Sequence, residues 1–511
     1  MRITILFAIS ACGVAPVFGA STCESLTSLK LKNTTIATAE TIAAGAFTSP
    51  LPATKGKQPQ AFRSLPAFCR VAATLTPVSD SEIKIEVWLP ENGPEKQWNG
   101  NLQSVGNGAW AGTISYPAMA TALTAGYATA STDTGHSGGD PATFVPGHPE
   151  KVIDFSYRAV HEMTVAAKAI IGARYGDGPK YSYWNGCSTG GRQALTEAQR
   201  YAADYDGIIA GAAAIYTTHL QGAQVWSAEV VHKDEASYIP PAKYAALHAA
   251  VLEACDELDG VKDGVLENPT KCHFDPQKLS CSNVTKDADG PSCLTAPQVD
   301  AARQIYAGPK NSQGKSLFPG LERGSETGWA TLSGTKPMAL ADETYKFLVF
   351  KDADWNYLNF NAERDIATGD KTAGSLMNSI DPNLKPLFSR GGKVLMFHGW
   401  ADPGIAPQNS VNYYDSVVEK LGKAAVSNSI RLFMVPGMGH CAGGDGTSTF
   451  NMMDAMSAWV EQGKAPDRIE ASRVRAGKTD RTRPLCPYPQ VAVYNGLGSI
   501  DESANFSCKV Q

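Results

Sequence analysis

The most chemically informative stretch of the sequence is a serine flanked by glycines. Residues 186–191 read Gly-Cys-Ser-Thr-Gly-Gly, a G-x-S-x-G pattern centred on Ser188. Such glycines allow a sharp turn between a strand and a helix, which exposes the serine hydroxyl at the helix N-terminus. A chain with 48 glycines can also contain the pattern by chance, as a plain glycine-rich turn. The strand expected before it and the helix expected after it favour a nucleophilic serine.

A nucleophilic serine needs a base that takes its proton and an acid that orients the base. On an α/β-hydrolase scaffold these residues follow in the order Ser, Asp or Glu, and His, each after a later strand. Asp402 follows the apolar run 394–397, and His440 follows the apolar run 430–435. We therefore predict that His440 is the general base and that Asp402 holds its imidazole ring.

Two other residues compete for these roles. His398 ends the apolar run 394–397, where a structural hydrogen bond is the better interpretation. Asp133 follows the expected strand 126–132 and is the rival acid. Because Asp133 precedes Ser188 in the chain, it is the weaker choice.

Two cysteines provide an independent check on this assignment. Cys187 immediately precedes the serine, and Cys441 immediately follows the histidine. If Ser188 and His440 are in hydrogen-bond contact, their neighbours must also lie close together. A disulfide needs Cα atoms only ~4.4–6.8 Å apart, so a Cys187–Cys441 bond is geometrically plausible. The alternative is that both cysteines pair elsewhere.

An oxyanion hole requires two backbone donors. We expect one from the amide of Thr189 and the other from the glycine-rich turn 106–110, with Gly108 as the candidate. This turn also fits the dinucleotide-binding pattern G-x-G-x-x-A. We reject that interpretation, because no acidic residue follows about twenty positions later at the end of a strand. No organic cofactor is expected.

The elements that must position these residues occur in two stretches of alternating strands and helices. The first has strands at 102–105, 126–132, 181–184 and 207–210, with helices at 158–175 and 191–202. The second has strands at 394–397 and 430–435, with a helix at 410–421. This alternation predicts an α/β fold, a doubly wound and mostly parallel sheet of the α/β-hydrolase type.

Between the two stretches the pattern changes to turns, cysteines and irregular helical pieces. We predict a lid domain at 212–385, inserted between the two parts of the catalytic domain at 21–211 and 386–511. Within it, residues 256–265 place three aspartates and two glycines in a short loop. Hard cations prefer such oxygen ligands, although the spacing is not that of an EF-hand. A solvated acidic turn is the alternative.

The N-terminus predicts secretion. Residues 1–20 have a short basic start, an apolar stretch too short for the ~20 residues that span a bilayer, and small residues at a cleavage point. Without Cys12 in this signal peptide, ten of the 11 cysteines remain, an even number typical of an extracellular protein. N-x-S/T sequons at Asn33, Asn283 and Asn505 are candidate glycosylation sites.

Composition narrows the possible partners. The formal net charge is −5, and no run of lysine or arginine suggests a nucleic-acid-binding surface. No segment after the signal peptide is apolar for long enough to span a membrane. The expected partners are therefore small or polymer-linked substrates, and the oligomeric state is open.

Taken together, these motifs resemble the tannase and feruloyl esterase family, most closely its fungal feruloyl esterase B members. The likeness rests on Gly-Cys-Ser-Thr-Gly-Gly at 186–191, Asp402, the His440-Cys441 pair, Gly-Asn-Gly-Ala-Trp-Ala-Gly at 106–112, the loop 256–265 and Arg-Pro-Leu-Cys-Pro-Tyr-Pro at 483–489. It covers nearly the whole mature chain.

The resemblance carries further expectations. It implies a structural calcium ion in the lid, held by Asp256, Asp259 and Asp263 and by the carbonyls of Val261 and Val265. It implies the disulfides Cys23–Cys69, Cys255–Cys272, Cys281–Cys293 and Cys486–Cys508 beside Cys187–Cys441. It also implies hydrolysis of hydroxycinnamate esters, such as ferulate and p-coumarate linked to plant cell-wall sugars.

Two other functions remain open at this point. A tannase would cleave gallate esters with the same chemistry, and would differ in the ring hydroxyls that the lid pocket satisfies. A non-catalytic extracellular carbohydrate-binding protein on the same scaffold is the other alternative. The presence of Ser188, Asp402 and His440 disfavours it.

Overall fold

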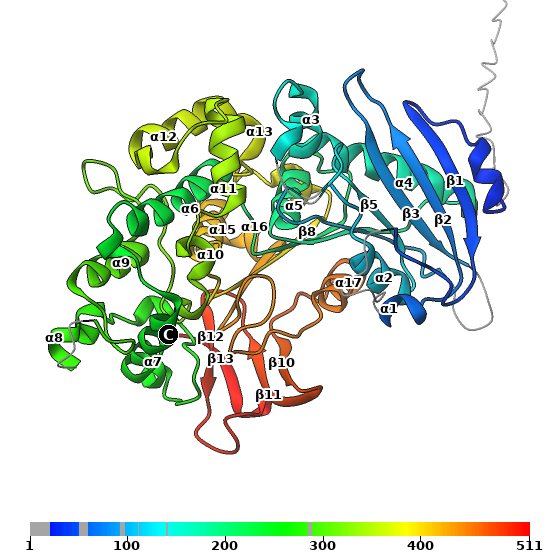
Figure 1. Cartoon of the computed structure of the whole chain (residues 1–511). Coiled ribbons are helices and arrows are strands. Elements are labelled where there is room, and N and C mark those ends of the chain that lie inside the picture. The colour runs from blue at the N-terminus through cyan, green and yellow to red at the C-terminus, as the bar shows by residue number, and fades with distance from the viewer. Residues whose placement is uncertain (1–20, 51–59, 92–97, 111, 139–141, 285–288) are drawn as a thin grey trace, which may run out of the picture.

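The computed structural model describes residues 21–50, 60–91, 98–110, 112–138, 142–284 and 289–511. The predicted signal peptide lies outside these ranges. The described residues form a nine-stranded sheet in the order β1-β2-β3-β5-β4-β6-β7-β8-β9 (Figure 1). Its strands are β1 (Thr34–Ile42), β2 (Phe68–Leu75), β3 (Ile83–Pro90), β4 (Leu102–Val105), β5 (Ala128–Thr132), β6 (Ser182–Cys187), β7 (Gly207–Gly211), β8 (Lys393–Gly399) and β9 (Ile430–Val435).

The sheet is parallel from β5 through β4, β6, β7 and β8 to β9. Strands β5 and β7 are buried along their whole length, as expected of strands covered on both faces. The six strands predicted from sequence correspond to β4 through β9, and their ends differ by no more than three residues. The chain has the predicted α/β-hydrolase fold.

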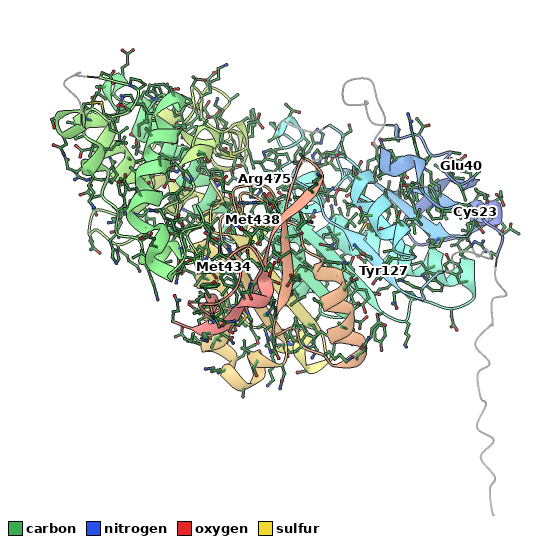
Figure 2. The ribbon with its side chains drawn as sticks, turned by 90° about the horizontal axis from the view of Figure 1, so that it is seen from below. Cys23, Glu40, Tyr127, Met434, Met438 and Arg475 are labelled. Atoms are coloured by element: carbon green, nitrogen blue, oxygen red, sulfur yellow. A yellow bond between two sulfur atoms is a disulfide. The ribbon has the colours of Figure 1, made fainter. Side chains whose placement is uncertain are left out.

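The antiparallel edge was not predicted. Strands β1, β2 and β3 pair antiparallel with one another, and β3 pairs antiparallel with β5. Two further hairpins lie near the C-terminus, formed by β10 (Ile469–Arg475) with β11 (Lys478–Leu485) and by β12 (Gln490–Tyr494) with β13 (Phe506–Val510). In Figure 2, Arg475 in the β10–β11 hairpin lies near the middle of the molecule, far from Cys23 at the edge of the sheet.

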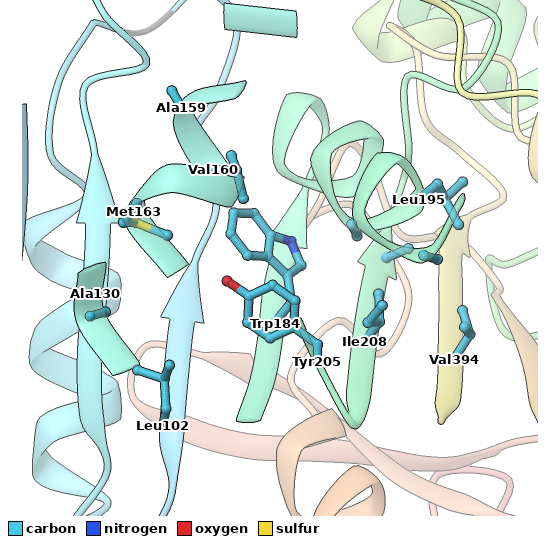
Figure 3. Packing of buried hydrophobic residues seen from close by; sticks show 14 of the residues in the cluster. Leu102, Ala130, Ala159, Val160, Met163, Trp184, Leu195, Tyr205, Ile208 and Val394 are labelled. Carbon is cyan, nitrogen blue, oxygen red and sulfur yellow. The ribbon is translucent and has the colours of Figure 1, made fainter. Parts of the chain in front are cut away.

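Helices cover both faces of the sheet. The helices around the sheet are α1 (Gln60–Arg63), α2 (Tyr116–Thr124), α3 (Pro149–Ile153), α4 (Ala159–Tyr175), α5 (Thr189–Arg200), α15 (Gln408–Leu421), α16 (Lys423–Ser427) and α17 (Met452–Gln462). Trp184 of β6 is central to the core, with Val160 and Met163 of α4 beside it (Figure 3). Its indole Nε1 donates to the carbonyl of Gly190, 3.0 Å away. The core thus fixes where α5 begins, directly after the candidate nucleophile.

The segment between β7 and β8 is helical, and its described residues add no strand to the sheet. Its α-helices are α6 (Thr217–His232), α7 (Tyr244–Cys255), α8 (Cys281–Val284), α9 (Ala296–Ala307), α10 (Ala330–Ser333), α11 (Ala339–Glu343), α12 (Ala362–Gly369), α13 (Ser375–Met377) and α14 (Lys385–Ser389). A separate apolar core around Trp329 joins several of them. These helices lie to one side of the sheet in Figure 1.

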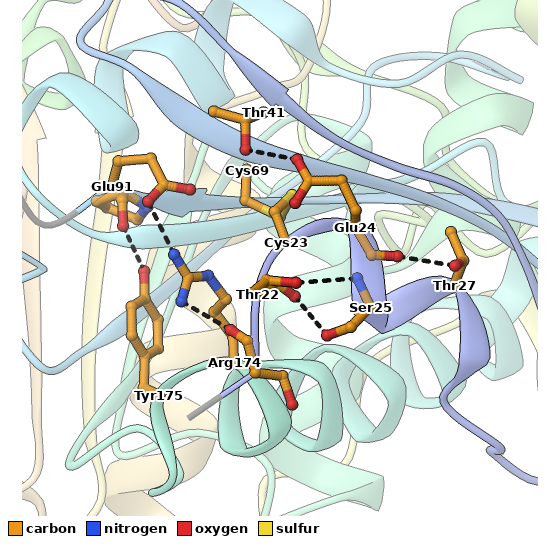
Figure 4. The surroundings of a disulfide bond; sticks show 12 residues. Thr22, Cys23, Glu24, Ser25, Thr27, Thr41, Cys69, Glu91, Arg174 and Tyr175 are labelled. Atoms are coloured by element: carbon orange, nitrogen blue, oxygen red, sulfur yellow. Dashed lines mark hydrogen bonds and ion pairs between the residues drawn. A yellow bond between two sulfur atoms is a disulfide. The ribbon is translucent and has the colours of Figure 1, made fainter. Parts of the chain in front are cut away.

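Five disulfides connect the described cysteines, in the pairs Cys23–Cys69, Cys187–Cys441, Cys255–Cys272, Cys281–Cys293 and Cys486–Cys508. These are the pairs expected from sequence and family resemblance. Figure 4 shows the first of them, which joins the N-terminal segment to β2. There Glu24 accepts a hydrogen bond from Thr41, and Arg174 pairs with Glu91 at 2.8 Å.

The three sequon asparagines differ in their surroundings. Asn33 and Asn283 are exposed, and Asn505 is half-buried. The side-chain amides of Asn283 and Asn505 donate to the carbonyls of Gln277 and Ser499 at 2.9 Å. Because glycosylation substitutes one of the two amide hydrogens, the remaining N–H at these two sites would have to serve the same hydrogen bond. Among the described residues, no helix is long and apolar enough to cross a membrane.

Candidate active site

Ser188 lies at the sharp turn between β6 and α5, with φ 64° and ψ −122°. This left-handed backbone is unfavourable for a residue with a Cβ, and it projects the side chain outward at the head of α5. The turn is possible because glycines surround it. A Cβ on Gly186 would lie 2.5 Å from the Gly190 oxygen, and one on Gly106 would lie 2.6 Å from the Gly190 Cα. The strand, the helix and the neighbouring loop can therefore approach this closely only because these positions carry no side chain.

Asp402 and His440 lie after β8 and β9, as predicted. Asp402 is fully buried, and its Oδ2 lies 2.7 Å from His440 Nδ1. The amides of Gly404 and Ile405 donate to Oδ1 at 2.8 and 3.0 Å. These bonds orient the His440 ring and leave its Nε2 available for a proton from Ser188, which lines the same cavity.

The electrostatics suit a base and its partner. Burial raises the pKa of Asp402, but hydrogen bonds from His398 and His440 outweigh it and hold that pKa well below its usual range. Burial lowers the pKa of His440, but the hydrogen bond and the charge of Asp402 more than offset it, so the pKa lies above its ordinary 6.5. Asp402 is therefore ionised and stabilises a protonated imidazole.

His398 is the second histidine on Asp402. It is fully buried, and its Nε2 lies 3.1 Å from both Asp402 Oδ2 and the Ile405 carbonyl. Its Nδ1 lies 2.7 Å from the hydroxyl of Ser410. His398 thus makes structural hydrogen bonds, and Ser410 joins the network although the sequence gives no signal for it.

Asp133, the rival acid, lies elsewhere. Its Oδ1 accepts from the amides of Lys84 and Gly135, both at 2.9 Å. It lines a different, polar cavity with His136 and His148. Burial raises the pKa of Asp133 to about 7. The structure brings Asp402, and not Asp133, to His440.

The candidate nucleophile opens into a cavity of about 650 Å³, including its mouth. The sheet domain contributes the elbow, the histidine loop and the loop around Trp110, and the helical segment covers them. Its lining residues are Ala109, Trp110, Phe155, Ser188, Thr189, Arg192, Ala214, Thr217, Leu220, Gln221, Gln224, Thr331, Met338, Leu340, Met377, Pro403, Gly404, Ile405 and His440. The lining is largely apolar with a few polar groups, as in a site for a small organic ligand.

The predicted oxyanion donors come from two adjoining segments. Thr189 is the first residue of α5, where a helix leaves its N–H group unpaired. The loop 106–110 is fixed against the elbow, since the Asn107 carbonyl accepts from Gly190 and the Ala109 carbonyl accepts from the Thr189 hydroxyl. From this loop Ala109 and Trp110 line the cavity, whereas Gly108 does not. The amide of Ala109 therefore competes with that of Gly108 for the second donor.

The disulfide Cys187–Cys441 joins the residues next to Ser188 and His440. Its Cα atoms are 6.0 Å apart, and its partners are separated by 254 residues in the chain. The bond therefore connects the two segments that must hold the nucleophile and the base at a fixed distance from each other.

We expect the double variant Cys187→Ala/Cys441→Ala to lower kcat/KM by about 100-fold, because a misplacement of ~1 Å between reacting groups has effects of that size. The matched control is Cys281→Ala/Cys293→Ala, which removes a disulfide of the helical segment. The control should keep its kcat/KM within about twofold. Steady-state kinetics on one ester, at a temperature where all proteins are folded, measures both, and equal losses in the two variants would contradict the expectation.

The acidic loop predicted to bind a cation lies beside the C-terminal hairpins. Asp259, Val261, Asp263 and Val265 line one small cavity, together with Arg481 and Arg483 of β11. The fifth predicted ligand, Asp256, is buried, and its Oδ1 accepts from the amides of Asp263 and Gly264 at 3.2 and 3.1 Å.

The charges of this loop are partly neutralised by the protein. Asp263 pairs with Arg481 at 3.2 Å and with Arg483. Burial and the nearby carboxylates of Asp263 and Asp256 raise the pKa of Asp259 to about 6. Within the described ranges, no three His, Cys, Asp or Glu side chains are grouped as metal ligands. The carboxylate and carbonyl oxygens of this loop are nevertheless the kind of ligand that a hard cation such as Ca²⁺ prefers.

The fold and the Ser188, His440 and Asp402 geometry define the chain as an α/β-hydrolase with a serine-type site. A sequence model of the family described as "Tannase and feruloyl esterase" matches residues 69–509. The chain belongs to the tannase and feruloyl esterase family and is a carboxylic ester hydrolase.

Individual relatives agree with this assignment. An uncharacterised esterase of Xanthomonas campestris is 38% identical, with 95% of this chain and 91% of the relative aligned. Feruloyl esterase B of Aspergillus niger is 33% identical, with 86% of each chain aligned. The crystal structure of feruloyl esterase B from Aspergillus oryzae superposes with a TM-score of 0.87 at 30% identity, covering 95% of this chain and 99% of the other.

Proposed function

We propose that this esterase hydrolyses hydroxycinnamate esters, feruloyl and p-coumaroyl, of plant cell-wall polysaccharides. The observation that carries the proposal is the largely apolar cavity between Ser188 and helix α6, whose lining suits an aromatic acyl group. The similarity to feruloyl esterase B of Aspergillus niger and of Aspergillus oryzae supports it. Five disulfides and the signal-like N-terminus support a secreted enzyme.

The proposed reaction runs through an acyl-enzyme. The Ser188 Oγ attacks the ester carbonyl carbon while His440 Nε2 takes the hydroxyl proton. The amide of Thr189 and an amide of the 106–110 loop stabilise the oxyanion. The intermediate collapses, and His440 returns the proton to the departing alcohol. A water molecule then attacks the acyl-enzyme with the same base, which releases the acid and restores Ser188.

A panel of three methyl esters tests the substrate. We expect the purified enzyme to hydrolyse methyl ferulate and methyl p-coumarate with kcat/KM at least about tenfold above that for methyl gallate, because a mostly apolar cavity disfavours a ring with three hydroxyls. Turnover of gallate alone would contradict the proposal and indicate a tannase. If the enzyme hydrolyses none of the three esters, the proposal that its substrates carry an aromatic acyl group is contradicted.

We also propose that the loop 256–265 binds a structural calcium ion through Asp256, Asp259 and Asp263 and the carbonyls of Val261 and Val265. Removal of a metal that binds only the folded state lowers stability, so EDTA should lower the melting temperature by about 5 °C. Excess Ca²⁺ should restore it and Mg²⁺ should not, since Mg²⁺ demands a tighter octahedral site. In Asp259→Asn we expect the response to EDTA to disappear. A melting temperature that EDTA leaves unchanged in the wild type would overturn this proposal.

A further inference from the structure

One face of helix α6 lines the catalytic cavity. Thr217, Leu220, Gln221 and Gln224 all border it, and their spacing of three and four residues places them on the same side of the helix. Around them the lining is apolar, with Met338 and Met377 among its members. The polar side chains of this face are Thr217, Gln221 and Gln224, and any of them that lacks a partner within the protein could orient a ligand.

Most polar side chains at this cavity already have partners. The Thr217 hydroxyl lies 2.9 Å from the carbonyls of Ala214 and Met377. The Arg192 guanidinium donates to the carbonyls of Ser156 and Phe155 at 3.0 and 3.2 Å. These side chains therefore stabilise the wall of the cavity through hydrogen bonds to the backbone of neighbouring segments.

Gln221 is different. Its side chain is 4% exposed and makes no hydrogen bond to any described residue, and its Oε1 is buried without a partner. Buried polar groups are almost always paired, because leaving one unpaired forfeits its hydration without compensation. An unpaired amide at the edge of a ligand cavity is explained when a ligand supplies the missing partner.

Gln224, one turn further along α6, provides the comparison. Its Oε1 is also unpartnered, but its Nε2 donates to the carbonyl of Gly404 at 2.8 Å. That bond fixes the amide, and turning it over would lose the bond. The amide of Gln221 has no such anchor, so it can turn over and offer either its oxygen or its NH₂ group to a ligand.

We propose that Gln221 is a specificity-determining residue that accepts a hydrogen bond from a phenolic hydroxyl on the aromatic ring of the acyl group. The proposal rests on the hydroxycinnamate function given above. A ring without that hydroxyl would bind the same apolar walls but leave the Gln221 oxygen unpaired. Sites built around such a bond discriminate strongly against the analogue that lacks it.

The test compares methyl p-coumarate, which has a 4-hydroxyl, with methyl cinnamate, which has none, and with methyl 4-methoxycinnamate, which has an oxygen but no donor. In the wild type we expect kcat/KM for p-coumarate to exceed that for both others by about tenfold or more. In Gln221→Met, which keeps the length of the side chain, the ratios should fall to near one through a loss on p-coumarate. Turnover of methyl cinnamate should change by less than about threefold.

Gln224→Met is the matched control. It removes the anchor on Gly404, so we expect it to affect all three esters alike and to leave the ratios unchanged. The inference is overturned if Gln221→Met keeps the wild-type ratios, or if Gln224→Met abolishes them while Gln221→Met does not. A wild type that cleaves none of the three esters would overturn the proposed function together with the inference. If the esters are cleaved and Gln221→Met leaves the kcat/KM ratios of the wild type unaltered, the inference alone is overturned.

Discussion

Replacing Ser188 by alanine should lower kcat on methyl ferulate by about a million-fold, the loss measured when the nucleophile of another serine hydrolase is removed. The hydroxyl is the atom that becomes acylated, and no other hydroxyl lies at this turn with the same geometry. Thr189 cannot replace it, because its hydroxyl already donates to the Ala109 carbonyl at 2.9 Å.

The folded structure should survive this change. Alanine, like serine, carries a Cβ, so the strain at φ 64° is the same in both proteins. We therefore expect the melting temperature of Ser188→Ala to lie within about 2 °C of the wild type, since 1 kcal/mol of destabilisation shifts it by only about 2–4 °C even in domains of 150–250 residues. A folded Ser188→Ala protein that retains more than a tenth of wild-type turnover would refute the assignment of the nucleophile.

Replacing Asp402 by asparagine should lower kcat by about 10⁴-fold, as for the equivalent change in a serine protease. The side chain keeps its shape but loses its charge, and its amide would favour the wrong tautomer of His440. It would also break the contact with His398, whose Nε2 lies 3.1 Å from Oδ2. Asp133→Asn is the control, and because Asp133 lines another cavity it should change kcat by less than about threefold. Equal losses in the two variants would contradict the assignment of the acid.

The pH profile provides a second readout of the same change. His440 acts as a base only when neutral, and its pKa is raised above 6.5 by Asp402. In the wild type, kcat/KM should therefore fall as the pH drops through a value above 6.5. In Asp402→Asn, burial of His440 remains while the charge is gone, so the acidic limb should move to lower pH. An acidic limb that stays in place would show that Asp402 does not set the pKa of His440.

The sequence by itself determined the parallel part of the sheet and the elements of the candidate catalytic site. Strands β7 and β8 could be predicted because a strand buried on both faces is a continuous apolar run. The turn at Ser188 could be predicted because its backbone demands glycines at fixed offsets. Asp402 and His440 followed from their positions after strands, since the carboxyl ends of parallel strands meet at one edge of the sheet.

Only the tertiary structure decided the remainder. The edge strand β1 is half-exposed and irregular in its burial, and a register shift interrupts its pairing, so no clear alternation identifies it in the sequence. The strands of the β10–β11 hairpin are rich in charged residues, with β11 exposed over its first three residues, and β12 and β13 have only five residues each. Local sequence cannot identify such strands, because their pairing partners stabilise them.

The same reason applies to the finer parts of the site. Ser410 reaches His398 only because α15 packs beside β8, and Arg483 reaches Asp263 across 220 residues of chain. Gln221 has no sequence signal, since a glutamine on a helix is usually exposed. Its role follows from the placement of α6 over Ser188, which buries its amide without a partner. The sequence thus identifies the candidate catalytic residues, whereas the packing of the helical segment decides which groups line the cavity beside them.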